Sequence, residues 1–423
     1  MSFAVVLRRI IREGSLRLID SAGHAHLIGD GSAHTVSVRS LSRRLDYMLT
    51  LSPTLLLGEA YMDGRLLIEE GSLYDFLALL ARQEGGSPTP AWFSFLARLR
   101  SRLKQSNPVG TARRNAAHHY DLSDALYALF LDDDRQYSCA YFTRADDTLE
   151  QAQAAKKRHV AAKLLLDRPG LRVLDIGSGW GGLALYLAAE AGADVTGVTL
   201  STNQHAVSNS RAAAAGLSEQ ARFHLRDYRA ETGCYDRIVS VGMFEHLGRR
   251  HYREFFGKLR DLLIDDGIAV IHSIGYADRP GPIDPFMRKY IFPGADLPAL
   301  SEVFAAMERV GLITSDVEIL QTHYAETLAH WRRRFLANRD KAAALYDDRF
   351  CRMWEYYLAL CEVGFRYRTT MVFQLVLARR KDALPMTRDH MFNWERAHRR
   401  PSLQGGHVGA RSQSAADDLP PAG

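Results

Sequence analysis

Apolar residues in the second half of the chain gather in short runs, and helix-like stretches separate several of them. The runs occupy residues 172–176, 194–200, 221–225, 237–241, 268–274 and 370–380. Residues 181–190 and 203–215, between the first three runs, are predicted to be helices. Strands that alternate with helices form a mostly parallel sheet whose faces are covered by the helices. The pattern therefore predicts an α/β fold for residues 118–381.

The first 85 residues follow a different pattern and are predicted to form a smaller unit. Residues 15–20 and 34–40 resemble strands. Ser72 is a suitable N-cap for the helix that follows it, whose apolar stripe consists of Leu73, Phe76, Leu77 and Leu80. Strands and a helix together predict a small α+β domain at 1–85.

Two segments are predicted to lie outside these domains. Residues 86–117 begin in a stretch rich in Gly, Ser and Pro, which indicates a linker. Residues 382–423 form a polar tail that contains Pro and Gly, and we expect disorder near its end. A chain of 423 residues is long enough for two or three domains of this kind.

Charge is nearly balanced, with 54 Lys and Arg against 49 Asp and Glu. The net charge of +5 is too small to indicate a nucleic-acid partner. Basic residues do cluster in the linker, just after Trp92, Phe93 and Phe95, at Arg98, Arg100, Arg102 and Lys104. This cluster suits either an anionic membrane surface or a solvated linker face.

Cysteine content and the absence of long apolar runs point to a cytoplasmic location. The four cysteines form no C-x-x-C pair, so a disulfide framework is not expected. The apolar run at the start precedes the arginines, which is the wrong order for a signal peptide. No stretch of about 18 apolar residues exists, so any lipid contact is expected at the membrane surface.

A glycine-rich turn follows the strand at 172–176 and leads into a helix. Glycines there let the backbone approach a ligand, and the helix N-terminus adds amide donors. The next strand ends at 198–204 without the acidic residue that an NAD enzyme would place there, which favours S-adenosylmethionine. Asp227 and Tyr228 offer an acceptor and a ring for an adenine. A tight packing turn without a ligand is the alternative.

Two polar residues near predicted strand ends, together with Cys139, are candidates for chemistry. Glu245 follows the strand at 237–241, and His272 lies within the strand at 268–274. Taken singly, Glu245 is equally suited to cap a helix, His272 to be a core histidine, and Cys139 to be a small buried apolar residue.

The motifs and their order resemble the cyclopropane-fatty-acyl-phospholipid synthases and the related mycolic-acid cyclopropane synthases. The matching stretches are residues 118–142, 173–182, 198–204, 242–248, 270–275, 289–303 and 323–331, and residues 57–66 resemble the N-terminal domain of the family. Seven motifs in the same order are far more specific than one glycine-rich turn.

The resemblance implies a class I S-adenosylmethionine-dependent methyltransferase fold, Rossmann-like, beside an N-terminal domain for lipid access. The implied reaction forms a cyclopropane ring at the double bond of an unsaturated acyl chain in phospholipid. The implied partner is the bilayer surface, reached peripherally from the cytoplasmic side, without nucleic acid. A homodimer is a further expectation.

The resemblance also assigns residues to the site. The expected cofactor contacts are Tyr137, Ser138, Leu174, Asp175, Gly177, Ser178, Gly179, Trp180, Gly181, Thr199, Leu200, Ser201, Gln204, Asp227 and Tyr228. A bicarbonate base is expected to be held by Cys139, Glu245, His272 and Tyr324. No metal is expected, because the residues lack a second close ligand pair.

Cys361 matches a cysteine assigned to the active site in the family. It shares a helical stripe with Trp354, Tyr357, Leu358 and Phe365, which favours a buried structural thiol instead.

Three alternative functions differ from the cyclopropane reaction. The same scaffold could methylate acyl chains to methyl-branched or methylene products. A lipid-binding or regulatory protein is a second alternative, disfavoured by the intact candidate residues. An RNA methyltransferase is a third, disfavoured by the modest net charge and by the lack of an Asn-Pro-Pro-Tyr loop.

Overall fold

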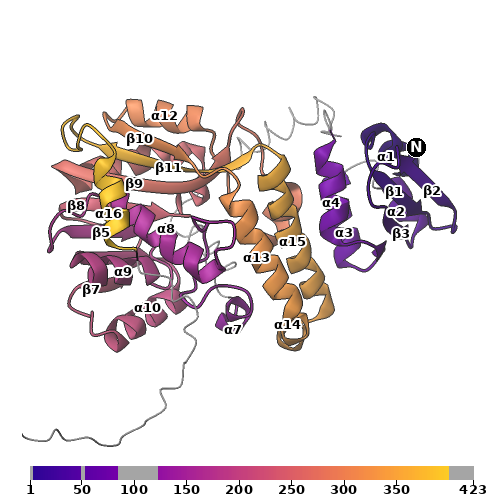
Figure 1. Ribbon diagram of the computed structural model, residues 1–423, viewed down its shortest axis with the longest axis horizontal. Coiled ribbons are helices and arrows are strands. Elements are labelled where there is room, and N and C mark those ends of the chain that lie inside the picture. Colours follow the sequence, from indigo (N-terminus) through magenta and orange to yellow (C-terminus); the bar gives the residue numbers. More distant parts are fainter. Residues whose placement is uncertain (1–2, 49–52, 84–121, 400–423) are drawn as a thin grey trace, which may run out of the picture.

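A computed structural model describes residues 3–48, 53–83 and 122–399 of the chain (Figure 1). The predicted linker at 86–117, with its basic cluster, lies outside the described residues. So does the end of the predicted tail, from residue 400 onwards.

A seven-stranded sheet forms the centre of the larger part, in the order β10-β11-β9-β8-β5-β6-β7. The strands are β5 (Arg172–Ile176), β6 (Asp194–Thr199), β7 (Ala221–Leu225), β8 (Tyr235–Val241), β9 (Leu263–Tyr276), β10 (Ile313–Ile319) and β11 (Thr370–Ala378). The strands from β5 to β9 run parallel, while β11 is antiparallel to both β9 and β10. The sheet is thus mostly parallel, as predicted.

Helices cover both faces of this sheet. One face packs against α8 (Leu149–Lys163), α9 (Gly182–Ala191), α10 (Thr202–Ala214) and α16 (Asp389–Ala397). The other face packs against α11 (Tyr252–Leu262) and α12 (Leu300–Glu308). The predicted α/β fold class is confirmed. Residues 389–397 of the predicted tail are also ordered, since α16 packs on α8 and buries Met391.

The N-terminal part is an α+β unit, as expected from its strand and helix patterns. Its four-stranded sheet has the order β2-β1-β3-β4. The elements are α1 (Phe3–Ile10), β1 (Ser15–Ile19), β2 (Ala25–Gly29), β3 (Val36–Ser40), α2 (Arg43–Met48), α3 (Pro53–Met62), β4 (Leu66–Glu70) and α4 (Leu73–Arg82). Ser72 caps α4 by accepting from the amide of Asp75.

A helical layer joins the two parts and contributes to the core of each. It consists of α13 (His323–Ala337), α14 (Arg339–Leu345) and α15 (Asp348–Tyr367), with the short α7 (Asp124–Ala128) nearby. Helices α3 and α4 pack on α15, so they stand between the small sheet and this layer (Figure 1). One hydrophobic cluster runs from Phe3 and Leu16 in the N-terminal unit to Trp331 and Trp354 in the layer.

The described residues contain no helix that is both long and apolar enough to span a bilayer.

Candidate active site

A glycine-rich turn joins β5 to α9 and exposes its backbone to a crevice. Gly177 and Gly181 both have a φ of +83°, a conformation that favours glycine. A Cβ on Gly177 would lie 3.0 Å from the Cβ of Met243, and one on Gly181 would lie 2.8 Å from the ring of Phe223. The amide of Gly177 donates to the carbonyl oxygen of Val198 over 2.9 Å, which fixes the turn against the end of β6. Larger side chains would therefore displace neighbouring elements.

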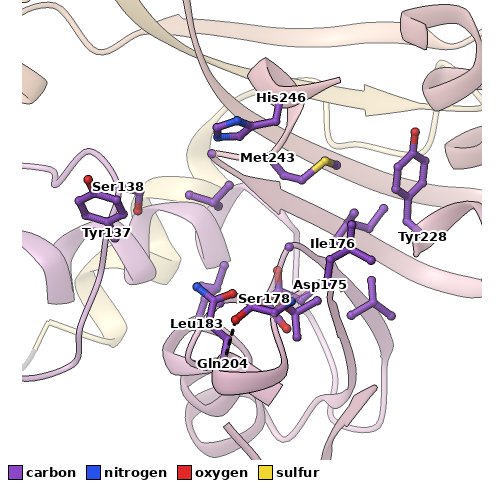
Figure 2. A pocket seen from close by; sticks show the side chains of 18 of the residues that line it. Tyr137, Ser138, Asp175, Ile176, Ser178, Leu183, Gln204, Tyr228, Met243 and His246 are labelled. Atoms are coloured by element: carbon purple, nitrogen blue, oxygen red, sulfur yellow. Dashed lines mark hydrogen bonds between the residues drawn. The ribbon is translucent and has the colours of Figure 1, made fainter. Parts of the chain in front are cut away.

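A pocket opens at the carboxyl ends of β5, β6 and β8 (Figure 2). The strand order reverses at β5, because β6 lies on one side of it and β8 on the other. Open α/β sheets bind ligands at such a point. The predicted cofactor residues that line the pocket are Tyr137, Ser138, Asp175, Gly177, Ser178, Gly179, Trp180, Thr199, Leu200, Ser201, Gln204, Asp227 and Tyr228. Leu174 and Gly181, also predicted, are not among its lining residues.

Four buried polar atoms at this pocket have no hydrogen-bond partner among the described residues, one of them Nε1 of Trp180. The other three are Oδ2 of Asp175, Oγ of Ser178 and the phenol oxygen of Tyr228. Burial raises the pKa of Asp175 to about 7. Leaving buried polar atoms unpaired is costly, so this lining fits a polar ligand that would satisfy them.

The pocket has two distinct ends. Tyr137 and Ser138 lie at one end and Tyr228 lies at the other (Figure 2). The Asp227 carboxylate, expected to accept from an adenine, already accepts from Arg229 Nε over 2.9 Å and from a second guanidinium nitrogen over 2.7 Å. Arg229 therefore fixes the orientation of Asp227 at the Tyr228 end.

The segment that carries Tyr137 and Ser138 is held by contacts to helices. The Tyr137 ring stacks on Trp331 with ring centroids 5.1 Å apart, and its hydroxyl lies 2.8 Å from that of Tyr357. Gln153 donates to the carbonyl oxygen of Ser138 over 2.9 Å. These contacts anchor the segment to α8, α13 and α15.

Two residues that the sequence analysis did not single out line the pocket and have a pKa that burial lowers. Burial lowers the pKa of His246 to about 4, so its imidazole is neutral. Burial likewise lowers the pKa of Lys156 to about 8. His246 directly follows Glu245 in a motif that carries the resemblance, which is a usable sequence signal. Lys156 lies in a polar, alanine-rich helix that gives no such signal.

Two of the four residues expected to hold bicarbonate are brought together at α13. The Cys139 thiol donates to the carbonyl oxygen of Ala140 over 3.3 Å, and the amide of Ala140 donates to Thr327 Oγ1 over 3.0 Å. Tyr324 lies one turn before Thr327 on the same helix and packs edge-on against Trp331. Burial raises the pKa of the Cys139 thiol, so the thiol is protonated.

Glu245 lies in the short helix Phe244–His246 and contacts Ser273 of β9, whereas His272 is itself a residue of β9. The Glu245 carboxylate accepts from Ser273 Oγ over 3.0 Å, and burial raises its pKa to about 7. His272 Nδ1 lies 3.0 Å from Nε2 of Gln374, and burial keeps the pKa of His272 well below its usual value. Consecutive strand residues point to opposite faces, so His272 lies on the face of β9 opposite Ser273, the residue that Glu245 contacts. None of Cys139, Glu245, His272 and Tyr324 is among the described pocket-lining residues.

The Cys361 thiol lies on α15 and packs on the main hydrophobic cluster. Its Sγ is 4.0 Å from the Met287 sulfur, and burial raises its pKa. A nucleophilic thiol needs a lowered pKa, so this environment favours the structural interpretation over the catalytic one.

No set of three or more His, Cys, Asp or Glu side chains in residues 3–48, 53–83 and 122–399 is arranged to hold a metal ion.

Comparison with known proteins identifies the family. The sequence profile of the mycolic acid cyclopropane synthetase family matches residues 109–375. The chain belongs to this family. It is therefore an S-adenosylmethionine-dependent methyltransferase, and both the resemblance and the enzyme class expected from the sequence are confirmed.

Individual relatives cover most of the chain. The cyclopropane-fatty-acyl-phospholipid synthase of Escherichia coli K12 is 38% identical over 324 residues, covering 76% of this chain and 82% of its own. The tuberculostearic acid methyltransferase UfaA1 of Mycobacterium tuberculosis is 36% identical over 395 residues, covering 88% and 90%. The structure of mycolic acid cyclopropane synthase CmaA1 with SAH and CTAB matches with a TM-score of 0.60 at 35% identity, covering 63% and 97%. The class I methyltransferase fold is confirmed.

Proposed function

We propose that this enzyme transfers a methylene group from S-adenosylmethionine to the cis double bond of unsaturated fatty acyl chains in phospholipids, forming a cyclopropane ring. The observation that carries the proposal is the glycine-lined pocket at the point where the sheet order reverses, in a chain of this family. The similarity to the E. coli phospholipid synthase supports the phospholipid substrate.

The pocket suits S-adenosylmethionine in both shape and polarity. Tyr228 offers a ring for the adenine, while the glycine turn admits the middle of the ligand. Ser178 and Asp175 would receive hydrogen-bond partners that the described residues do not supply. The related structure that contains SAH supports this assignment.

The reaction requires a cationic intermediate to be sheltered from water. When bound, the cofactor supplies a methyl carbon on a sulfonium, electrophilic enough for an alkene to attack. Tyr137 and Phe292 line the pocket, and Phe292 lies edge-on to Tyr357 with centroids 5.9 Å apart. Such rings exclude water and stabilise positive charge on the acyl chain.

Ring closure also requires a base, and we propose that a bound bicarbonate ion supplies it. Glu245 would accept the hydroxyl hydrogen of that ion, while His272 and Tyr324 would donate to its oxygens. Glu245 fits this role because it is buried and its pKa lies near neutrality. The proposal therefore depends most on Glu245, because His272 lies on the face of β9 opposite Ser273, the residue that Glu245 contacts.

Access to the double bond is proposed to be peripheral, from the cytoplasmic face of the membrane. The N-terminal unit contacts the larger part through Glu59, which accepts from Lys289 over 2.6 Å and from Tyr290 over 2.9 Å. Substituting Arg98, Arg100, Arg102 and Lys104 together should weaken binding to anionic vesicles in a salt-dependent way. Unchanged vesicle binding would contradict the membrane role. Sedimentation of the purified protein tests the expected homodimer.

The product separates this function from its alternative. Cells that express the protein should accumulate cyclopropane acyl chains in their phospholipids, compared with cells that lack it. The similarity to the tuberculostearic acid methyltransferase makes a methyl-branched product the second candidate. Methyl-branched chains in place of cyclopropane chains would replace the proposed function with that candidate.

A further inference from the structure

A fully buried ammonium group forms part of the cofactor pocket wall. Lys156 lies in the middle of α8, has no exposed surface, and lines the pocket. Its Nζ donates to Oε1 of Gln136 and to Oγ of Ser138, the latter over 3.0 Å. An ammonium carries three hydrogens. The third has no partner among the described residues.

The positive charge of Lys156 also lacks a direct counter-charge. No carboxylate in the described ranges comes within ion-pair distance of it, although Asp132, Asp134 and Asp175 lie close enough to act electrostatically. Asp134 is already paired with Lys157 and Arg211. A buried charge without an ion pair is costly unless a bound group compensates it.

Ser138 is oriented by this lysine. Its hydroxyl oxygen accepts from Lys156, so the hydroxyl hydrogen points to another acceptor. Ser138 lies at the end of the pocket opposite Tyr228 (Figure 2). If adenine occupies the Tyr228 end, the amino acid portion of the cofactor reaches the Ser138 end. The negative group that it carries there is a carboxylate.

We propose that Lys156 binds the carboxylate of S-adenosylmethionine directly, with Ser138 donating to the same group. The inference rests on the proposed cofactor site and adds a residue to it. Charge-assisted hydrogen bonds of this kind are about twice as strong as neutral ones. Lys156 would thus position the methyl carbon by fixing the far end of the ligand.

The decisive experiment compares two ligands that differ in this carboxylate. S-adenosylhomocysteine carries the amino acid portion, and 5′-methylthioadenosine lacks it. Calorimetric titration of both into the wild-type protein and Lys156→Met gives four dissociation constants. We expect the variant to bind S-adenosylhomocysteine about tenfold to a hundredfold more weakly, the usual range for losing a hydrogen bond to a charged group. Its affinity for 5′-methylthioadenosine should stay unchanged.

Lys163→Met is the matched control. Lys163 lies two turns further along α8 and is equally buried, but it pairs with Glu318 and does not line the pocket. This variant should leave the ratio of the two affinities unchanged. A loss of the same size in Lys163→Met would attribute the effect to α8 as a whole and overturn the proposal.

Other outcomes are equally decisive. If Lys156→Met binds both ligands more weakly by the same factor, the lysine only supports the fold, and the proposal is overturned. If that variant does not fold, Ser138→Ala takes its place, because it keeps the ammonium group. It should weaken the binding of S-adenosylhomocysteine and leave the binding of 5′-methylthioadenosine unchanged. An affinity for S-adenosylhomocysteine equal to that of the wild-type protein would overturn the proposal. Lys156 also lies within electrostatic range of Cys139 and His272. Unchanged affinities with an altered bicarbonate dependence would assign the lysine to that ion.

A failure of the proposed cofactor site has a different signature. In that case the wild-type protein itself would bind neither ligand. If the wild-type protein binds both ligands and Lys156→Met binds both with the same affinities, the proposed role of the lysine is overturned. The proposed cofactor site is then still supported.

Discussion

Replacing Glu245 by Gln should stabilise the protein while it removes activity. Glu245 is 5% exposed, and its carboxyl has Ser273 Oγ and the Ile274 amide as partners. Glutamine has nearly the same shape and can accept the same hydrogen bonds, but it carries no charge. The variant therefore isolates the free energy of keeping a carboxylate buried at this position.

The magnitude follows from the pKa shift. Burial raises the pKa of Glu245 from 4.5 to about 7. Between these values the folded chain keeps a proton that the unfolded chain has lost, so stability falls as pH rises through the window. At about 1.4 kcal/mol per pKa unit, the cost approaches about 3.5 kcal/mol well above pH 7 and is small near pH 4.5.

Urea denaturation followed by tryptophan fluorescence at about pH 5 and about pH 8 measures this difference. The free energy of unfolding of Glu245→Gln, relative to wild type, should rise by about 2–3 kcal/mol between the two pH values. The Asp175 carboxyl is present in both proteins, so its titration cancels. A difference that stays constant with pH would refute the assignment of a buried, high-pKa carboxyl. Activity should fall by roughly 10²–10⁴-fold, the range for a group acting on one proton transfer.

Three further predictions address the base, the lysine and the glycine turn. Ring formation should slow in bicarbonate-free buffer, recover when bicarbonate is restored, and be unaffected by a chelator; full activity without bicarbonate would contradict the proposed base. The preference for S-adenosylhomocysteine over 5′-methylthioadenosine should weaken as pH rises above about 8, where Lys156 loses its proton, and calorimetry of Lys156→Met should show no such pH dependence. Gly181→Ala should lower stability by about 1–3 kcal/mol, measured by denaturation, because of its φ and its contact with Phe223; unchanged stability would show that the turn can relax.

The sequence predicts the sheet well where strands are short, apolar and bounded by turns. The strands at 172–176 and 221–225 agree with β5 and β7. The strand at 268–274 extends to Leu263–Tyr276, because Leu263 pairs with Tyr235 of β8 ahead of a register shift at the start of the strand. Strand β10 was not predicted, since its residues are largely half-exposed and include the charged Asp316 and Glu318.

The sequence predicted those site residues that belong to local sequence motifs. The glycine turn and most cofactor contacts are local in sequence, so their positions at the pocket followed from the strand order. Lys156 could not be found this way, because α8 combines Ala with charged residues and has the composition of a solvated helix. Its burial depends on the segment around Gln136 and on the sheet, which are distant in sequence. The different directions of Glu245 and His272 likewise depend on tertiary packing.

The measurement that tests the central claim most directly uses S-adenosylmethionine labelled with deuterium at its methyl group. The purified protein is incubated with vesicles of an unsaturated phospholipid, and the modified acyl chains are analysed by mass spectrometry before and after hydrogenation. Ring closure removes one deuterium and consumes the double bond, so the product should carry a CD₂ group and resist mild hydrogenation. An intact CD₃ group, or a product that still takes up hydrogen, would contradict cyclopropane formation.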